Sequence, residues 1–208
     1  MRLLGPLGCG IQTGAGTVLQ YFQPKFGDSI VVFGAGAVGL AGVMAAKLMN
    51  MEHIIVVNRP NSYRLDMAKQ LGATDIIESK DGVDVVAEIK KITGNGTDFA
   101  LETTGATSCI KASVNSIKPR GIDAVVGIAG DVTFNVNDDI MGDSKTISGV
   151  IEGDAVPQLF IPKIVRYYKK GLFPFDKLTK FYDFDDINQA FDDSASGKVI
   201  KPIVVFDK

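Results

Sequence analysis

The sequence predicts an α/β fold built on a doubly wound parallel sheet, and three observations support this prediction. Short β-branched runs recur about 20 to 25 residues apart, which is the spacing of strand–helix–strand units. Helical patterns lie between these runs, and glycine or proline breakers separate the two kinds of segment. The runs lack polar alternation, as is typical of a parallel sheet that helices cover on both faces.

Strands and helices are expected to alternate along most of the chain. The expected strands are residues 30–33, 54–57, 75–77, 99–102, 124–128 and 146–151. The expected helices are residues 38–49, 62–71, 83–92 and 107–117, with breaks at residues 72, 94–96 and 119–121. After Gly153 the rhythm changes. We expect an amphipathic helix over residues 159–170, a short helix capped by Asp185, and a last strand over residues 201–206.

Composition and charge exclude several classes of function. The 208 residues include 22 Lys and Arg against 24 Asp and Glu, so the chain lacks the basic character of a nucleic-acid-binding protein. One His and two Cys are too few and too scattered to build a zinc site alone. Residues 30–46 carry no charge and approach the length of a membrane span, but their glycines better fit a strand, turn and helix. We expect a cytoplasmic protein with no membrane segment.

A glycine-rich turn is the main functional motif. Strand residues 30–33 lead into Gly34, Gly36 and Gly39 in the spacing G-x-G-x-x-G, and a helical pattern follows. In this arrangement the first glycine makes the tight turn, the second admits a pyrophosphate, and the third lets helix and strand pack closely. The helix N-terminus presents free N–H groups to the phosphates. The motif predicts dinucleotide binding, and a glycine-rich turn without a ligand is the alternative.

The residue that ends the next strand bears on which dinucleotide binds. An NAD site carries Asp or Glu about 20 residues after the turn, where it accepts hydrogen bonds from the adenosine ribose. Here the residue is Asn58, which does not repel the 2′-phosphate of NADP, and Arg59 with Arg64 can pair with that phosphate. Alternatively, Arg59 stacks on adenine while Asn58 bonds the ribose, and NAD remains acceptable. We expect NADP or NAD, with a preference for NADP.

Five segments are specific enough to compare with known families. They are residues 7–16, 64–74, 101–105, 149–153 and 173–175. Together they resemble the zinc-dependent medium-chain alcohol dehydrogenases, most closely the aryl-alcohol (benzyl-alcohol) branch. The similarity covers nearly the whole chain but corresponds to only the later half of a family member.

The resemblance implies that the chain consists of three segments. Residues 28–153 form a dinucleotide-binding Rossmann domain with a six-stranded parallel sheet. Residues 1–27 are a remnant of the catalytic domain with a linking helix. Residues 154–208 are a helix and a return segment toward that catalytic domain, so the N- and C-terminal segments make an incomplete second lobe. We expect the aromatic side chains of the C-terminal segment to face the absent domain.

The resemblance also implies an activity and site residues. The reaction is hydride transfer between a primary, aryl alcohol and a nicotinamide, with a catalytic zinc polarising the oxygen of the alcohol or aldehyde. Cys9 would be one zinc ligand, and a homodimer would form through the edge strand at residues 147–151. Further residues along the cofactor would be Thr13, Val38, Thr104, Ile128, Val150, Ile151 and Lys201.

Two functions remain open at this point. In the first, the chain is part of an alcohol dehydrogenase that binds the dinucleotide but lacks the other zinc ligands, so it holds no zinc and turns over no alcohol alone. In the second, it is a stand-alone NAD(P)-binding module that reports cofactor level or redox state to a partner. His53, just before the second expected strand, is expected to be a surface or loop histidine, and Cys109 a small buried thiol.

Overall fold

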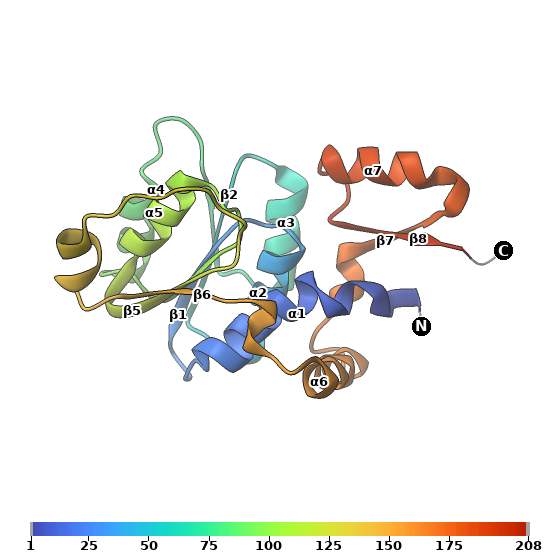
Figure 1. Cartoon of the computed structure of the whole chain (residues 1–208), viewed down its shortest axis with the longest axis horizontal. Helices are drawn as coiled ribbons and strands as arrows, with labels where there is room; N and C mark the ends of the chain where they lie inside the picture. Colours follow the sequence, from blue (N-terminus) through green and yellow to red (C-terminus); the bar gives the residue numbers. More distant parts are fainter. Residues whose placement is uncertain (1, 207–208) are drawn as a thin grey trace.

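Six parallel strands form the central sheet of the computed structural model, which describes residues 2–206 (Figure 1). They are β1 (Ser29–Phe33), β2 (His53–Asn58), β3 (Asp75–Glu78), β4 (Thr97–Glu102), β5 (Ile117–Val125) and β6 (Thr146–Gly149). Their spatial order is β3–β2–β1–β4–β5–β6, and each neighbouring pair is parallel. The chain winds outward on both sides of β1, so the strand order reverses between β1 and β4. The predicted doubly wound sheet is confirmed.

Helices cover both faces of this sheet because its central strands, β1, β2 and β4, are apolar on both sides. The connecting helices are α2 (Ala37–Leu48), α3 (Ser62–Leu71), α4 (Val85–Thr93) and α5 (Thr107–Ser116). Successive strand residues point to opposite faces. Ile30 and Val32 of β1 therefore pack in the cluster that includes α2 and α3, and Val31 and Phe33 pack in the cluster with α4 and α5. Each such buried side chain contributes about 1.5 to 3 kcal/mol of transfer free energy.

The segment before β1 packs against α2. It consists of η1 (Arg2–Gly8), α1 (Gly10–Gly16) and η2 (Thr17–Phe22). Gly14 allows the closest approach, because a Cβ at this position would lie 1.9 Å from the carbonyl oxygen of Val38. Ile11 and Ala15 of α1 are buried in the same core cluster as α2. Backbone contact at Gly14 thus fixes α1 against the first turn of α2.

The C-terminal segment forms a second, smaller sheet beside the first (Figure 1). The parallel strands β7 (Thr179–Asp183) and β8 (Lys201–Val205) are joined by α7 (Ile187–Ala195), and α6 (Pro157–Lys169) precedes them. The remaining short helices are η3 (Val136–Met141), η4 (Glu152–Asp154), η5 (Phe175–Leu178) and η6 (Phe184–Asp186). The sequence pattern predicted the last strand, but it did not predict β7.

The structure corrects several local predictions. β5 begins at Ile117 and runs through residues 119–121, where its register against β4 shifts and Arg120 adopts a φ of +66°. The predicted break is therefore an unpaired stretch between Ile117 and Ile122 inside β5, and Ile128 lies beyond the end of the strand. β6 ends at Gly149, two residues early, and α7 begins after Asp186 instead of Asp185.

The aromatic side chains of the C-terminal segment divide into two groups. Phe173 and Phe175 are buried in the main core cluster. Phe181, Phe184 and Phe191 are 44%, 50% and 69% exposed. The expectation that the aromatic side chains of this segment face the absent domain is therefore wrong for Phe173 and Phe175, because these side chains complete the core of this chain.

Residues 30–46, whose uncharged sequence raised the question of a membrane span, contain β1, the glycine turn and most of α2. Within residues 2–206, no helix combines the length and the apolar character that crossing a bilayer requires.

A buried carboxylate links the elements of the smaller sheet. Asp193 of α7 is 5% exposed and accepts hydrogen bonds from Tyr182 Oη at 2.7 Å, Lys180 Nζ at 3.2 Å and Gln189 Nε2 at 2.8 Å. These donors, Tyr182 first, lower the pKa of Asp193 from 3.8 to about 2. The carboxylate form of Asp193 therefore holds β7 against α7.

We expect Asp193→Asn to lower the melting temperature at pH 7, because an amide cannot accept all three hydrogen bonds. A depressed folded-state pKa gives stability that is present above the unfolded-state pKa and is lost as the pH falls from about 4 to 2. The difference between the wild type and the variant should therefore shrink over that window. Thermal unfolding followed by circular dichroism at pH 7 and pH 2.5 measures both effects, and equal melting temperatures at pH 7 would contradict the assignment.

Candidate functional site

The glycine turn at the end of β1 is built from positions with different requirements. Gly34 has a φ of +102°, and a Cβ there would lie 2.5 Å from Thr103 Oγ1. A Cβ at Gly39 would lie 1.9 Å from the carbonyl oxygen of Gly34. Both positions therefore need glycine for the fold itself, the first for the turn and the second for the contact between helix and turn.

Gly36 is different, because the fold leaves space in front of it. It is the N-cap residue of α2 with a φ of −88°, which any residue can adopt. The nearest atom to a Cβ at this position is Arg64 Nη1, 3.9 Å away. The α2 N-terminus, with its free N–H groups and partial positive charge, faces this space. This open position is a cradle that a Cβ would fill and that fits a pyrophosphate.

A cleft of about 610 Å³ opens at this turn. It lies at the carboxyl ends of the parallel strands, where the strand order reverses, which is the usual place for a ligand in an open α/β sheet. The residues that line it are Gly34, Ala35, Gly36, Ala37, Val38, Val57, Asn58, Arg59, Arg64, Ser79, Thr103, Thr104, Ala106, Ser108 and Cys109.

Asn58 connects the end of β2 to the glycine turn. Its Oδ1 accepts a hydrogen bond from the Ala35 N–H at 3.1 Å, and its Nδ2 donates to the Arg59 carbonyl at 2.7 Å. The amide of Asn58 therefore holds the turn in place, and it brings no negative charge to the cleft.

Glu102 shapes the opposite wall at the end of β4. This carboxyl group is fully buried and accepts hydrogen bonds from the backbone N–H groups of Thr104 at 2.8 Å and Gly105 at 3.1 Å. Thr103 Oγ1 donates to the Phe33 carbonyl at 2.7 Å, which ties the same loop to the end of β1. The loop after β4 is thereby fixed beside the glycine turn.

A second buried carboxyl group lies behind this wall. Asp123 of β5 is fully buried next to Ala100 of β4, and its Oδ1 has no hydrogen-bond partner among the described residues. Burial raises the pKa of Asp123 to about 7, the hydrogen bond from Ser113 lowers it, and the charge of Glu102 adds to the rise.

The structure brings half of the predicted site residues together. Those that line the cleft are Gly34, Gly36, Val38, Asn58, Arg59, Arg64 and Thr104. Gly39 lies behind the turn, where it packs against Gly34. The other predicted cofactor residues do not line the cleft, and they are Thr13, Ile128, Val150, Ile151 and Lys201.

The five predicted cofactor residues outside the cleft differ in how far they are buried. Thr13 is half-buried in α1, Val150 is 5% exposed, and Lys201 pairs with Thr179 in the smaller sheet. Ile128 and Ile151 are 101% and 84% exposed. Their assignment to the cofactor stays a prediction.

Several cleft residues were not predicted from the sequence. Ser79 and Thr103 directly follow β3 and β4, so the rule that parallel strands end at one edge of the sheet could have identified them. Ser108 and Cys109 lie in the first turn of α5. The prediction of a buried thiol at Cys109 is wrong, because this side chain is partly exposed and lines the cleft.

The described residues do not fit a zinc site. Cys9 is exposed at the start of α1. No three His, Cys, Asp or Glu residues within residues 2–206 lie close enough together to hold a metal ion, whereas a catalytic zinc takes three protein ligands. His53 is half-buried, 3.9 Å from Asp75, and forms no part of such a group.

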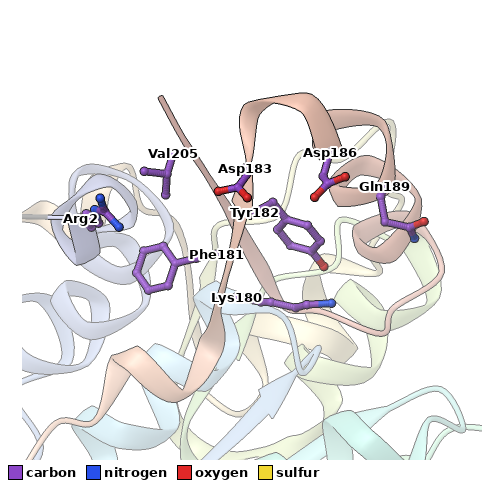
Figure 2. A pocket seen from close by; sticks show the side chains of 8 residues that line it. All are labelled: Arg2, Lys180, Phe181, Tyr182, Asp183, Asp186, Gln189 and Val205. Carbon is purple, nitrogen blue, oxygen red and sulfur yellow. The ribbon is translucent and has the colours of Figure 1, made fainter. Parts of the chain in front are cut away.

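Another hollow, of about 410 Å³, lies beside the smaller sheet (Figure 2). Arg2, Lys180, Asp183 and Asp186 surround it with charges of both signs, and Phe181 lines one side. It shares no residue with the cleft at the glycine turn, and its lining contains no glycine. The helix N-terminus beside it is that of α7, where the N-cap residue Asp186 brings a negative charge that disfavours a phosphate. The cleft is therefore the candidate functional site.

A doubly wound parallel sheet with a G-x-G-x-x-G turn opening into a cleft at the strand-order reversal defines a dinucleotide-binding domain of the Rossmann type. The sequence profile of the family described as "Zinc-binding dehydrogenase" matches residues 37–166, more than half of the chain. The chain belongs to this zinc-binding dehydrogenase family, and the resemblance to zinc-type alcohol dehydrogenases is confirmed.

Individual relatives agree with this assignment. Geraniol dehydrogenase of Castellaniella defragrans is 38% identical over 208 residues, which cover 99% of this chain and 56% of the relative. The crystal structure of benzyl alcohol dehydrogenase from Acinetobacter calcoaceticus matches with a TM-score of 0.94 and 48% identity, over 99% of this chain and 57% of that one. An alcohol dehydrogenase zinc-binding domain protein from Burkholderia ambifaria matches with a TM-score of 0.95 and 46% identity, over 100% of this chain and 56% of that one. The chain thus spans about half the length of these relatives.

Proposed function

We propose that the chain is the dinucleotide-binding part of a zinc-type alcohol dehydrogenase and that its cofactor is NADP or NAD. The observation that carries the proposal is the open cradle at Gly36, where the N-terminus of α2 faces a cleft that no side chain fills. When bound, the nicotinamide accepts or gives a hydride, while the chain's own residues bind and orient the dinucleotide. The glycine turn receives the pyrophosphate, and the ends of β2 and β4 flank it.

The proposed substrate of the whole enzyme is a primary alcohol or the corresponding aldehyde, and an aryl alcohol is the first candidate. The names of two relatives support a primary alcohol, because benzyl alcohol and geraniol both belong to this class, and benzyl alcohol alone supports an aryl alcohol. Since the described residues do not fit a zinc site, we propose that the chain alone holds no catalytic zinc and oxidises no alcohol.

A fluorescence titration with NADPH and NADH tests the first part of the proposal. We expect one dinucleotide to bind per chain, with enhanced nicotinamide fluorescence as the readout. An assay with benzyl alcohol, NADP or NAD, and added zinc tests the second part, and we expect no turnover. Failure of both dinucleotides to bind would refute the proposed function. Turnover by this chain alone would refute the proposed inactivity.

A stand-alone NAD(P)-binding module is the second candidate. The complete six-stranded sheet favours it, because a domain of this kind can fold and bind its cofactor by itself. The two candidates differ in their partner: the first needs the residues that supply the remaining zinc ligands, and the second needs a protein whose binding depends on the cofactor.

We further propose a homodimer formed through β6. This strand is the edge of the sheet within the described residues, and its outer backbone groups are available for pairing with a second copy. Sedimentation of a monomer at working concentration would refute the dimer.

The proposed location is the cytoplasm, because both cysteines are free thiols. Neither a nucleic acid nor a membrane is a proposed partner.

A further inference from the structure

We propose that this site selects the 2′-phosphorylated dinucleotide, NADPH over NADH, and that Arg64 with Arg59 binds the extra phosphate in a second cavity next to the cleft. This inference rests on the proposed dinucleotide binding. It names the form of the cofactor and the place of the phosphate that distinguishes the two forms.

The second cavity continues the cleft at its ribose end. It has a volume of about 350 Å³ and shares Asn58, Arg59 and Arg64 with the cleft. Its other wall is the end of α7 and the turn that follows, at residues 195–197. Space is therefore present beyond the position where a dinucleotide site holds the adenosine ribose.

The charge of this region is positive only. Among the described residues that line either cavity, two are arginines and none is Asp or Glu. At the end of β2, where a carboxylate would accept hydrogen bonds from the 2′-hydroxyl, Asn58 stands with its amide bonded to the Ala35 N–H and the Arg59 carbonyl. Asn58 is uncharged, so it does not repel a 2′-phosphate as a carboxylate at this position would.

Neither arginine is neutralised by the protein. In the part of the chain that the structure describes, Arg59 and Arg64 make no ion pair with a carboxylate. Arg64 Nε is also buried without a hydrogen-bond partner. A buried guanidinium N–H without a partner is costly, and a phosphate oxygen would satisfy it with a charge-assisted bond.

The position of Arg64 connects the two cavities. Its Nη1 lies 3.9 Å from a Cβ placed on Gly36, and its Nε lies 3.5 Å from a Cβ placed on Gly197. Its guanidinium therefore extends from the pyrophosphate cradle to the turn after α7. Asn61, whose Oδ1 accepts a hydrogen bond from the Arg64 N–H at 3.1 Å, fixes the backbone from which this side chain extends. A phosphate in the second cavity has Arg64 on one side and the exposed Arg59 at its entrance.

The test is a pair of fluorescence titrations with NADPH and NADH on the wild-type chain and three variants. We expect the wild type to bind NADPH at least about tenfold more tightly than NADH, a factor that corresponds to about 1.4 kcal/mol. Arg64→Gln should weaken NADPH binding at least about tenfold more than NADH binding. Asn58→Asp should reverse the preference, because it restores the repelling carboxylate. Lys69→Gln removes the same charge from an exposed position of α3 outside both cavities, and its preference should equal that of the wild type.

Competition with 2′-AMP and 5′-AMP tests whether the preference for NADPH comes from the 2′-phosphate. We expect 2′-AMP to displace NADPH more effectively from the wild type than 5′-AMP does, and to lose this advantage in Arg64→Gln. Equal affinity of the wild type for NADPH and NADH would overturn the inference and leave the proposed dinucleotide binding intact. Absence of binding by either dinucleotide would instead refute the proposed function. A preference for NADPH that Arg64→Gln and Asn58→Asp both leave unchanged would overturn the assigned phosphate site.

Discussion

Gly36→Leu is expected to abolish dinucleotide binding while the protein stays folded. Gly36 has backbone angles that any residue can adopt, and a Cβ at this position meets no protein atom closer than 3.9 Å. A leucine side chain would occupy the space in front of the α2 N-terminus, which we assign to the pyrophosphate. We expect affinity for NADPH to fall at least about 100-fold, equivalent to about 2.7 kcal/mol. Fluorescence titration measures the affinity, and circular dichroism with thermal unfolding measures the fold.

Two other glycine variants serve as controls for this result. Gly36→Ala adds only a Cβ and should weaken binding less than leucine does. Gly39→Ala should destabilise the protein itself, because its Cβ would lie 1.9 Å from the Gly34 carbonyl oxygen. Full-strength NADPH binding by a folded Gly36→Leu variant would contradict the assignment of the cradle and, with it, the proposed site.

Asp123→Asn is expected to stabilise the protein above pH 7. The carboxyl group is fully buried, and burial raises its pKa from 3.8 to about 7. Ser113 Oγ lies 2.6 Å from Asp123 Oδ2 and 2.9 Å from the Ile110 carbonyl, and one hydroxyl hydrogen cannot serve both acceptors. The hydrogen bond from Ser113 favours the carboxylate, but it does not offset the cost of burying the charge, and Asp123 Oδ1 has no partner among the described residues. An asparagine removes the buried charge.

The sign of the pH dependence follows from the raised pKa. Between about pH 4 and pH 7 the unfolded chain loses the Asp123 proton while the folded chain keeps it, so stability falls with rising pH and then levels off. At about 1.4 kcal/mol per pKa unit, the stabilisation by asparagine should reach about 2 to 4 kcal/mol at pH 8.5 and be smaller at pH 5. Urea unfolding at both pH values measures the free energies. Asp66→Asn makes the same change at an exposed position of α3 and should have little effect. A loss of stability in Asp123→Asn at pH 8.5 would show that the buried carboxylate is favourable.

The sequence predicted the central sheet well because each of its elements has a local signal. β1, β2 and β4 are largely apolar runs at regular spacing, and glycine or proline breakers separate the helices from the strands. The convergence of Gly36, Asn58 and Arg64 could also be predicted, because parallel strands end at one edge of the sheet and bring their following loops together.

The features that the sequence did not predict depend on contacts between distant segments. β7 contains Lys180 and Asp183, so its apolar pattern is weak, and it becomes a strand by pairing with β8 about twenty residues later. Pro119 indicated a break, and it lies in the unpaired stretch between Ile117 and Ile122. A residue without an N–H loses no ladder hydrogen bond there, so β5 continues beyond it. The exposure of Cys109 depends on how the loop after β4 sets the first turn of α5 against the cleft, and no local pattern encodes this.

The contact at Gly14 determines how the N-terminal segment can move. Because the α1 backbone touches the Val38 carbonyl without an intervening side chain, α1 and the head of α2 form one rigid body. The backbone of Cys9, one residue before α1, therefore stays near the cradle at Gly36 in every conformation that preserves this contact. A motion that separates α1 from the head of α2 therefore has to break this backbone contact first.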